Sequence, residues 1–189
     1  MLRDLIIKNR SYRRFHQDVA IERATLQELV DLARLSASGS NLQPLKFMLS
    51  CDGEKNAKIF ACLGWAAYLK DWPGPVEGER PSAYIVILGD KEISPSFGVN
   101  HGIAAQSILL GATETGLGGC IIGSVDQQKL TQGLEIPDRY EILLVLALGK
   151  PKETVVLETV GPEGDIKYWR DSEGVHHVPK RSLDEIIIG

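Results

Sequence analysis

The sequence predicts one α+β domain built around a central sheet. Two continuous apolar runs, YIVILG at 84–89 and ILLVLALG at 142–149, are typical of strands that are buried on both faces. Apolar residues at helical spacing, clearest in the segment after Thr25, predict helices that pack on such a sheet. Because no Pro-rich, Gly-rich or Ser-rich linker interrupts the 189 residues, we assign residues 1–189 to a single domain with a trailing C-terminal arm.

The first half of the chain alternates helix and strand. Residues 2–9 predict a short helix, and a second helix starts at Thr25, whose hydroxyl caps it while Glu28 completes a capping box. This helix ends in the polar stretch 36–43, which Pro44 closes. We further expect a strand over 45–51, a helix over 54–69 and an irregular loop over 72–81.

The helix predicted over residues 97–115 is the most informative one. Gly and Ala occupy more than one of its faces, and a helix without a clear polar face must be buried on most sides. In a chain of 189 residues, such burial suggests that a second subunit covers the helix. After it we expect a short extended piece over 120–122, a helix from Asp126 to Gly133, and a polar segment beyond Pro151.

The charge of the chain is mildly negative overall but positive at its start. Lys plus Arg number 21 and Asp plus Glu number 25, so the net charge is −4, which argues against nucleic-acid binding as the main task. The cations of the first fourteen residues are Arg3, Lys8, Arg10, Arg13 and Arg14, against a single Asp4. This cluster indicates either a small anionic ligand or a solvated helix end.

Several kinds of site and location are not expected. The three cysteines are odd in number and lack C-x-x-C spacing, which favours a reducing compartment such as the cytoplasm. The opening MLRDLIIKNR lacks the apolar core of a signal peptide, and the longest apolar run, 142–148, is far shorter than the roughly 20 residues that span a bilayer. His176 and His177 are adjacent in an extended segment and point to opposite sides, so we expect no metal site there.

The segment NRSYRRF, residues 9–15, is the first candidate for ligand binding. Arginine side chains match phosphate oxygens two at a time, and a serine hydroxyl can satisfy a third acceptor. Arg10, Ser11 and Arg13 therefore suit a phosphomonoester. The alternative is that these arginines form structural ion pairs.

The turn-rich segment SGSNLQP, residues 38–44, is the second candidate. The amides of Asn41 and Gln43 can bond the polar edge of a heterocycle, and the hydroxyls of Ser38 and Ser40 lie beside them in sequence. The alternative is a plain connecting loop.

The glycine-rich segment 116–124 is the third candidate. It follows a helix rather than a strand and has Ile at the last position of G-x-G-x-x-G, so it is not a dinucleotide-binding motif. We interpret its glycines as positions where backbone amides approach a flat ligand. Cys120 lacks an identifiable base and is interpreted as a buried apolar residue.

Taken in order, five motifs resemble the nitroreductase family of FMN-dependent oxidoreductases. They are RSYRRF at 10–15, SGSNLQP at 38–44, GIAAQSILLGATETGLGG at 102–119, ALGKP at 147–151 and PKRSL at 179–183. The resemblance implies the family's α+β fold, with a central, mainly antiparallel sheet flanked by helices. It also implies a homodimer with exchanged terminal segments, in which the arm over about 165–189 reaches the partner, and FMN bound at the subunit interface.

By this resemblance, Arg10, Ser11 and Arg13 hold the FMN phosphate and the pyrimidine edge of the flavin, and Arg3, Lys8 and Arg14 are ordinary surface charge. The backbone of Ile121, Ile122 and Gly123 lies near flavin N5. Lys180 and Arg181 close over the phosphate, and Ser38, Ser40, Asn41 and Gln43 reach the flavin from the other subunit. The chain is shorter between residues 65 and 97 than the classical enzymes, which carry a helical excursion there, so the substrate pocket differs most from theirs.

The implied activity is that of an oxidoreductase which takes a hydride from NADH or NADPH and reduces a nitroaromatic, a quinone or a similar small acceptor by a ping-pong mechanism. No side chain is expected to be catalytic, because the flavin carries the hydride. A fixed cation such as Arg13 would stabilise the negative charge that reduction places on the N1/O2 edge of the ring. Two alternatives remain open: an FMN-binding carrier or sensor without turnover, and an enzyme that remodels the flavin.

Overall fold

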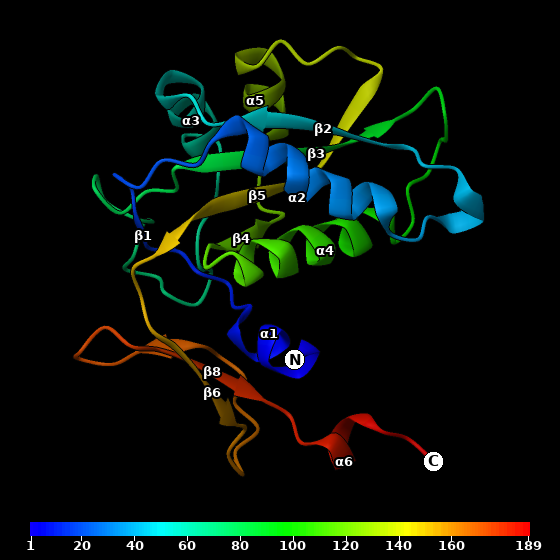
Figure 1. Cartoon of the computed structure of the whole chain (residues 1–189). Coiled ribbons are helices and arrows are strands. Elements are labelled where there is room, and N and C mark those ends of the chain that lie inside the picture. Colours follow the sequence, from blue (N-terminus) through cyan, green and yellow to red (C-terminus); the bar gives the residue numbers. More distant parts are fainter.

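The computed structural model describes all 189 residues. Figure 1 shows a layered body of sheet and helices, a small second sheet below it, and a C-terminal tail that points away from the body. In chain order the elements are α1 (Leu2–Lys8), β1 (Phe15–His16), α2 (Arg23–Leu35), η1 (Gly39–Asn41), β2 (Leu45–Ser50), α3 (Gly53–Phe60), β3 (Ala83–Asp90), α4 (Asn100–Glu114), β4 (Gly118–Ile122), α5 (Gln127–Gly133), β5 (Tyr140–Pro151), β6 (Val155–Thr159), β7 (Trp169–Arg170), β8 (His176–Lys180) and α6 (Leu183–Ile186).

The main sheet is antiparallel throughout. Its strand order is β1-β5-β3-β2, and β4 also pairs with β5. The long central strand β5 pairs with β3 from Ala83↔Leu148 to Asp90↔Tyr140. The expected α+β fold with a mainly antiparallel sheet is therefore confirmed.

Strand β3 shows why the apolar runs are continuous. All eight of its residues are buried, and alternate side chains enter different cores. Ile85 and Ile87 pack with α2 and α4, whereas Tyr84 and Val86 pack with α3 and α5. Because helices cover both faces of the sheet, the strand is largely apolar, and its one charged residue, the buried Asp90 at its end, is paired with Arg139.

Two helix starts differ from the sequence prediction. Helix α2 begins at Arg23 with Glu22 as its N-cap and no side-chain capping bond, so the capping box expected at Thr25 is wrong. Helix α4 begins at Asn100 rather than at 97, after Gly98 takes a left-handed φ of 47°. In both cases apolar spacing locates the helix but not its first turn.

Helix α3 ends much earlier than predicted. It stops at Phe60 instead of at 69, and the chain then turns toward the loop after β4. The backbone N–H of Gly64 donates to the Ser124 carbonyl at 2.8 Å, and Leu63 forms an isolated antiparallel bridge with Val125. These bonds satisfy the backbone of 61–65 in place of a helix.

Helix α4 is buried along one side. Its core residues include Ala105, Ile108 and Ala112, and a Cβ at Gly111 would lie 2.2 Å from Leu32 Cδ1 of α2. A larger residue there would make the ends of the Leu32 and Leu29 side chains shift, so glycine lets the two helices approach closely. Gly102, in contrast, is exposed in the single chain. Cover of that side by a second subunit stays a prediction.

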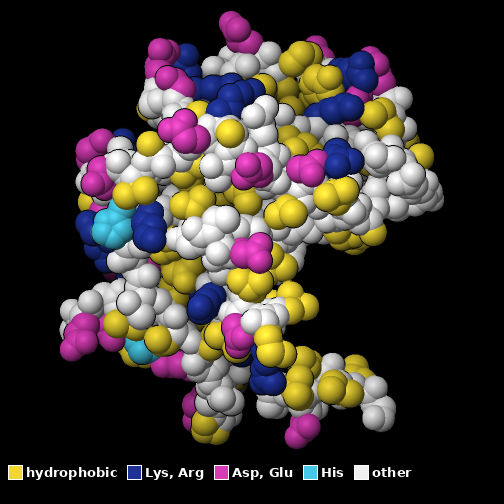
Figure 2. Space-filling model, viewed as in Figure 1, with side chains coloured by type: hydrophobic (Ala, Val, Ile, Leu, Met, Phe, Trp, Pro, Cys, Tyr) yellow, Lys and Arg dark blue, Asp and Glu magenta, His cyan; other side chains and the backbone are white.

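A second, three-stranded sheet follows Pro151, where no strands were predicted. Strand β8 lies between β6, which is parallel to it, and β7, which is antiparallel. Residues 169–180 of the expected arm therefore fold back on their own chain. From Arg181 onward the chain forms the tail, in which Ser182 and Glu185 cap α6. Figure 2 shows apolar side chains gathered on this protruding tail. No helix of the structure is long and apolar enough to cross a bilayer.

Candidate functional site

The segment between α1 and β1 lies along the edge of the main sheet. The Tyr12 N–H donates to the Gly119 carbonyl at 3.0 Å, and Ser11 forms a parallel bridge with Gly119 in β4. A Cβ at Gly118 would lie 2.5 Å from Tyr12 Cδ2, and one at Gly119 would lie 2.6 Å from the Ala147 carbonyl oxygen. These two glycines thus serve packing within the chain, which corrects their interpretation as positions of ligand approach.

This arrangement creates a pocket of about 270 Å³ beside the N-terminal segment, here called the basic pocket. Its lining residues are Asn9, Arg10, Ser11, Arg13, Tyr168, His176, Val178 and Lys180. The Arg10 Nη2 donates to the Ile6 carbonyl at 2.7 Å, while its buried Nε has no partner. Burial lowers the pKa of Arg10. The pocket therefore brings together four of the predicted residues and presents donors and positive charge to a ligand.

A second pocket of about 200 Å³, here called the β4 pocket, adjoins the first. Arg13 and Tyr168 line both pockets. Its other lining residues are Gly64, Trp65, Ala66, Ala67, Cys120, Ile121, Ile122, Gly123 and Ser124. The predicted backbone stretch at the end of β4 therefore shares a pocket with Arg13, and most of the other lining residues are apolar.

Cys120 behaves as predicted in this pocket. It is 4% exposed, and burial raises the pKa of its thiol. A protonated thiol is a weak nucleophile. The structure thus agrees with its interpretation as a buried apolar residue.

Arg13 lies at the junction of the two pockets and has no carboxylate partner on its guanidinium. Its Nη1 lies 3.3 Å from the Ser11 carbonyl oxygen and 3.3 Å from His176 Nε2. Its guanidinium carbon lies 4.8 Å from the centre of the Tyr168 ring. None of these partners carries a negative charge, so no ion pair within the chain neutralises the guanidinium of Arg13.

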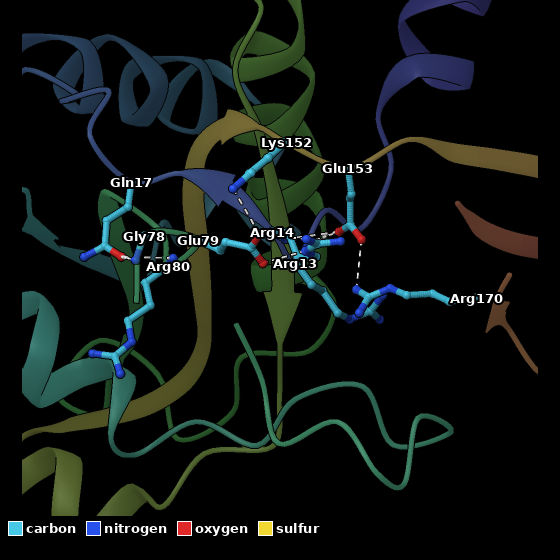
Figure 3. A network of polar contacts seen from close by, with 9 residues as sticks. All are labelled: Arg13, Arg14, Gln17, Gly78, Glu79, Arg80, Lys152, Glu153 and Arg170. Atoms are coloured by element: carbon cyan, nitrogen blue, oxygen red, sulfur yellow. Dashed lines mark hydrogen bonds and ion pairs between the residues drawn. The ribbon is translucent and has the colours of Figure 1, made fainter. Parts of the chain in front are cut away.

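Arg14 points elsewhere and is fully paired (Figure 3). Its Nε and Nη2 donate to the two carboxylate oxygens of Glu79, each at 2.6 Å, and Lys152 Nζ lies 3.1 Å from the same carboxylate. The hydrogen bonds from Arg14 lower the pKa of Glu79 to about 2. The expectation that Arg14 is ordinary surface charge is therefore wrong, because it forms a structural ion pair.

Glu153 connects these two arginines through their backbone. Its side chain is fully buried and accepts hydrogen bonds from the backbone N–H groups of Arg13 and Arg14. Its other oxygen accepts from Arg170 Nη2 at 2.9 Å (Figure 3). Glu153 thus holds the backbone of both arginines, whose side chains have different partners.

The loop over residues 38–44 lies in a different place. Ser38 and Gln43 line a separate pocket of about 230 Å³ between α2, β2 and α4, which shares no residue with the other two. Ser40, Asn41 and Gln43 have left-handed φ values of 50°, 55° and 50°. Non-glycine residues rarely adopt this conformation, which marks the loop as a strained segment.

Hydrogen bonds hold this loop in place. The Gln43 N–H donates to Ser38 Oγ at 3.0 Å, and the Gly39 N–H donates to Asn100 Oδ1 at 3.0 Å. Gln43 Nε2 donates to the Asn41 carbonyl at 3.1 Å. The side chains of Ser38 and Gln43 are therefore held by hydrogen bonds, but within one chain the loop shares no pocket with Arg13.

The second predicted cationic pair is divided. Lys180 lines the basic pocket, whereas Arg181 lies outside it, 3.5 Å from Glu185 of α6.

The adjacent histidines also separate, as predicted: His176 faces Arg13, and His177 contacts Glu158 and Asp171, which raise its pKa. No group of three His, Cys, Asp or Glu residues is placed to hold a metal ion.

Several residues around Arg13 were not singled out from the sequence. Glu153, Tyr168 and His176 lie far from Arg13 in the chain, and nothing in their local sequence indicates that the second sheet returns them to the N-terminal segment. The adjacent His176 and His177 indicated at most a metal site, which their opposite directions argue against.

The structure is thus an α+β fold whose main sheet is antiparallel, with a pocket lined by basic residues at the edge of that sheet. The chain belongs to the Nitroreductase family, whose model matches residues 6–73 and 78–150. The family expected from the motifs is thus confirmed, although the matched range ends before the second sheet.

Individual relatives agree with this membership. An NADPH-flavin oxidoreductase of Vibrio harveyi is 26% identical over 167 residues, which cover 79% of this chain and 65% of that relative's length. An FMN-dependent nitroreductase of Clostridium difficile R20291 is similar in structure, with a TM-score of 0.64, 27% identity and coverage of 78% and 86% of the two chains. A nitroreductase family protein of Streptococcus pneumoniae TIGR4 has a TM-score of 0.72 at 19% identity over the whole of both chains, and so has the same fold.

Proposed function

We propose that this protein is an FMN-dependent oxidoreductase that takes a hydride from NADH or NADPH and passes two electrons to a nitroaromatic, a quinone or a similar small acceptor by a ping-pong mechanism. Family membership and the relatives described as flavin oxidoreductase and nitroreductase support an oxidoreductase that uses FMN and a nicotinamide. The observation that carries the proposal in this chain is the unneutralised Arg13 at the junction of two adjoining pockets.

The residues present fit FMN. A phosphomonoester needs several donors, and the basic pocket offers the buried, unpartnered Nε of Arg10 together with Ser11 and Lys180. A flat ring needs an apolar slot with backbone on one side, and the β4 pocket offers Trp65 and the segment 121–124. In this proposal the phosphate lies in the basic pocket and the ring extends past Arg13 into the β4 pocket.

When bound, FMN would supply the hydride chemistry. The protein's residues would bind the cofactor, orient its ring and polarise the ring. Arg13 would place positive charge beside one edge of the ring, and the low exposure of Ile122 and Cys120 would limit water at the end of β4. Since a Cβ at Gly123 would meet only Leu144 Cδ2, at 3.8 Å, that position has room for close approach of a ligand to the backbone.

The proposed active unit is a homodimer. Within one chain the loop over 38–44 shares no pocket with Arg13, so its predicted contact with the flavin requires a second copy. Apolar residues are exposed on α1 and on the tail, for example Leu2 at 64%, Ile187 at 64% and Ile188 at 99%. Exposed apolar side chains gathered on a protruding segment, as on the tail, are typical of association surfaces.

Anaerobic mixing tests the proposal. Purified protein loaded with FMN should lose the long-wavelength flavin absorption on addition of NADH or NADPH, and a nitroaromatic or quinone should restore it. Bleaching by neither nicotinamide would contradict the oxidoreductase. A protein that binds FMN tightly but is never reduced would instead be a carrier or sensor, and one that neither arrives coloured nor takes up FMN would overturn the assignment of both pockets.

Arg3 provides a matched control for the binding part. It is an exposed cation of α1 outside both pockets. Arg3→Met should leave FMN affinity unchanged, whereas Arg10→Met should weaken it. Sedimentation of the full chain tests the dimer, which a single monomeric species at micromolar concentration would contradict.

A further inference from the structure

His176 lies in a position that the family match does not cover. It is the first residue of β8, paired with Val155 of β6 and Arg170 of β7, and it is 1% exposed. Its ring lies 5.2 Å from the Tyr168 ring and its Nε2 lies 3.3 Å from Arg13 Nη1. The second sheet therefore places a buried imidazole beside the arginine between the two pockets, and the Nδ1 atom of this ring has no hydrogen-bond partner.

The contact with Arg13 defines the protonation of this ring. A guanidinium has only donors, so a hydrogen bond between the two side chains requires Nε2 of His176 to be the acceptor and places the proton on Nδ1. Burial, together with the nearby cations Arg13 and Arg170, lowers the pKa of His176 to about 4. The ring is thus neutral at ordinary pH, and the contact leaves the charge of Arg13 intact.

We infer that His176 is a positioning residue for Arg13: its neutral imidazole accepts a hydrogen bond from the guanidinium and holds it at the junction of the two pockets without neutralising it. A carboxylate at this position would also hold Arg13, but as an ion pair like that of Arg14 with Glu79. Tyr168 completes the arrangement by covering the guanidinium with its ring.

The role of this device toward a ligand depends on the proposed function. If FMN lies across the junction, a fixed and unneutralised cation favours its phosphate and the negative charge that reduction adds to the ring. The second sheet would then set both the affinity and the potential of the cofactor, through residues beyond position 150 where the family match ends.

Three substitutions of His176 separate the hydrogen bond from packing and charge. His176→Gln keeps an acceptor near the place of Nε2 and should bind FMN within about twofold of the wild type. His176→Leu keeps bulk but removes the acceptor, and should weaken FMN binding about tenfold. His176→Glu should weaken it at least as much and should also lower the two-electron potential by about 30 mV if reduced FMN loses a further tenfold in binding.

His177→Gln is the matched control, because the neighbouring ring points to Glu158 and Asp171 on the other side of the strand. It should leave FMN affinity and potential unchanged. FMN titrations by fluorescence, with thermal unfolding to show that each variant is folded, are the measurements. The inference is overturned if His176→Leu binds FMN like the wild type, or if His176→Gln is as weak as His176→Leu.

A ligand-free measurement keeps this inference apart from the proposed function. Nitrogen NMR of the histidine rings at pH 6 should show His176 with its proton on Nδ1, and Arg13→Met should shift the Nε2 resonance. A protonated ring, or a proton on Nε2, would overturn the inference whether or not the protein binds FMN. If the NMR result is as expected but no FMN binds, only the proposed function fails.

Discussion

Arg13 and Arg14 are neighbours in sequence, yet their guanidinium groups lie in two regions that differ in electrostatics: one region contains a carboxylate partner and the other does not. The Arg14 network, formed by Arg14, Glu79 and Lys152, satisfies its cations with a carboxylate inside the chain. The junction of the two pockets holds Arg13 with a carbonyl oxygen, an imidazole and an aromatic ring. The cations of the first region are paired with a carboxylate, whereas the positive charge of Arg13 in the second region has no carboxylate partner.

This difference shows that neighbouring arginines in one cationic segment can have different surroundings: one is paired with a carboxylate and the other is not. Of the two interpretations offered by the sequence, structural ion pairing applies to Arg14, and ligand binding is our proposal for Arg13. Glu153 holds the backbone at the point where the two side chains diverge, because it accepts hydrogen bonds from both backbone N–H groups.

Of the substitutions that test this comparison, removal of the Arg14 guanidinium should cause the largest change in the free energy of unfolding. Arg14→Met leaves the partly buried Glu79 with Lys152 as its only cation and should lower the free energy of unfolding by about 3 kcal/mol, with FMN affinity of the folded protein unchanged. Urea unfolding with and without FMN measures both. Arg34→Met, which breaks an exposed pair with Asp31, should change stability by less than about 0.5 kcal/mol. Equal decreases in the free energy of unfolding of the two variants would contradict a structural role for Arg14.

A pair of glycine substitutions separates packing from ligand space in β4. Gly119→Ala places a Cβ 2.6 Å from the Ala147 carbonyl oxygen and should destabilise the fold by about 2 kcal/mol. Gly123→Ala meets only Leu144 at 3.8 Å and should leave the fold intact while it weakens FMN binding. Thermal unfolding and FMN titration test the pair. Unchanged FMN affinity in Gly123→Ala would place the ring away from this backbone.

The Arg14 network should also appear in the acid dependence of stability. The hydrogen bonds from Arg14 depress the folded-state pKa of Glu79 from 4.5 to about 2, so its contribution is present above pH 4.5 and is lost as the pH falls toward 2. After allowance for solvent screening, the wild type should lose about 1–2 kcal/mol more over this interval than Glu79→Gln. Denaturant unfolding at several pH values measures the difference, and parallel curves would contradict it.

The smallest effect concerns the second basic pair. Lys180 lines the basic pocket and Arg181 is paired with Glu185 outside it. Lys180→Ala should therefore weaken FMN binding about fivefold, equivalent to roughly 1 kcal/mol, and Arg181→Ala should have a smaller effect. FMN titrations of both variants decide the order. A larger loss in Arg181→Ala would place the phosphate beside the tail instead of in the basic pocket.

The main sheet was predictable because its central strands are buried on both faces. Continuous apolar runs located β3 and β5, since local sequence alone records burial of that kind. The second sheet was not predicted. Its strands are short and partly exposed, and the pairing of β6 with β8 joins segments about 20 residues apart, which no local pattern records.

The candidate site was predictable only in part, for a similar reason. The cationic segment 10–14 is local, so its presence is visible in the sequence. Which of its arginines is neutralised depends on Glu79, 65 residues from Arg14, and on His176, 163 residues from Arg13. Glu79 comes from the loop between α3 and β3 and His176 from the second sheet, so these distant contacts follow from tertiary packing and not from the spacing of charged residues.

The most direct test of this account is a comparison of FMN dissociation constants for the wild type, Arg13→Met and Arg14→Met, measured by quenching of FMN fluorescence under conditions where all three are folded. We expect Arg13→Met to weaken binding about tenfold or more and Arg14→Met to match the wild type. Equal affinity of wild type and Arg13→Met, or a loss confined to Arg14→Met, would contradict the claim that the chain leaves Arg13 unneutralised for its cofactor.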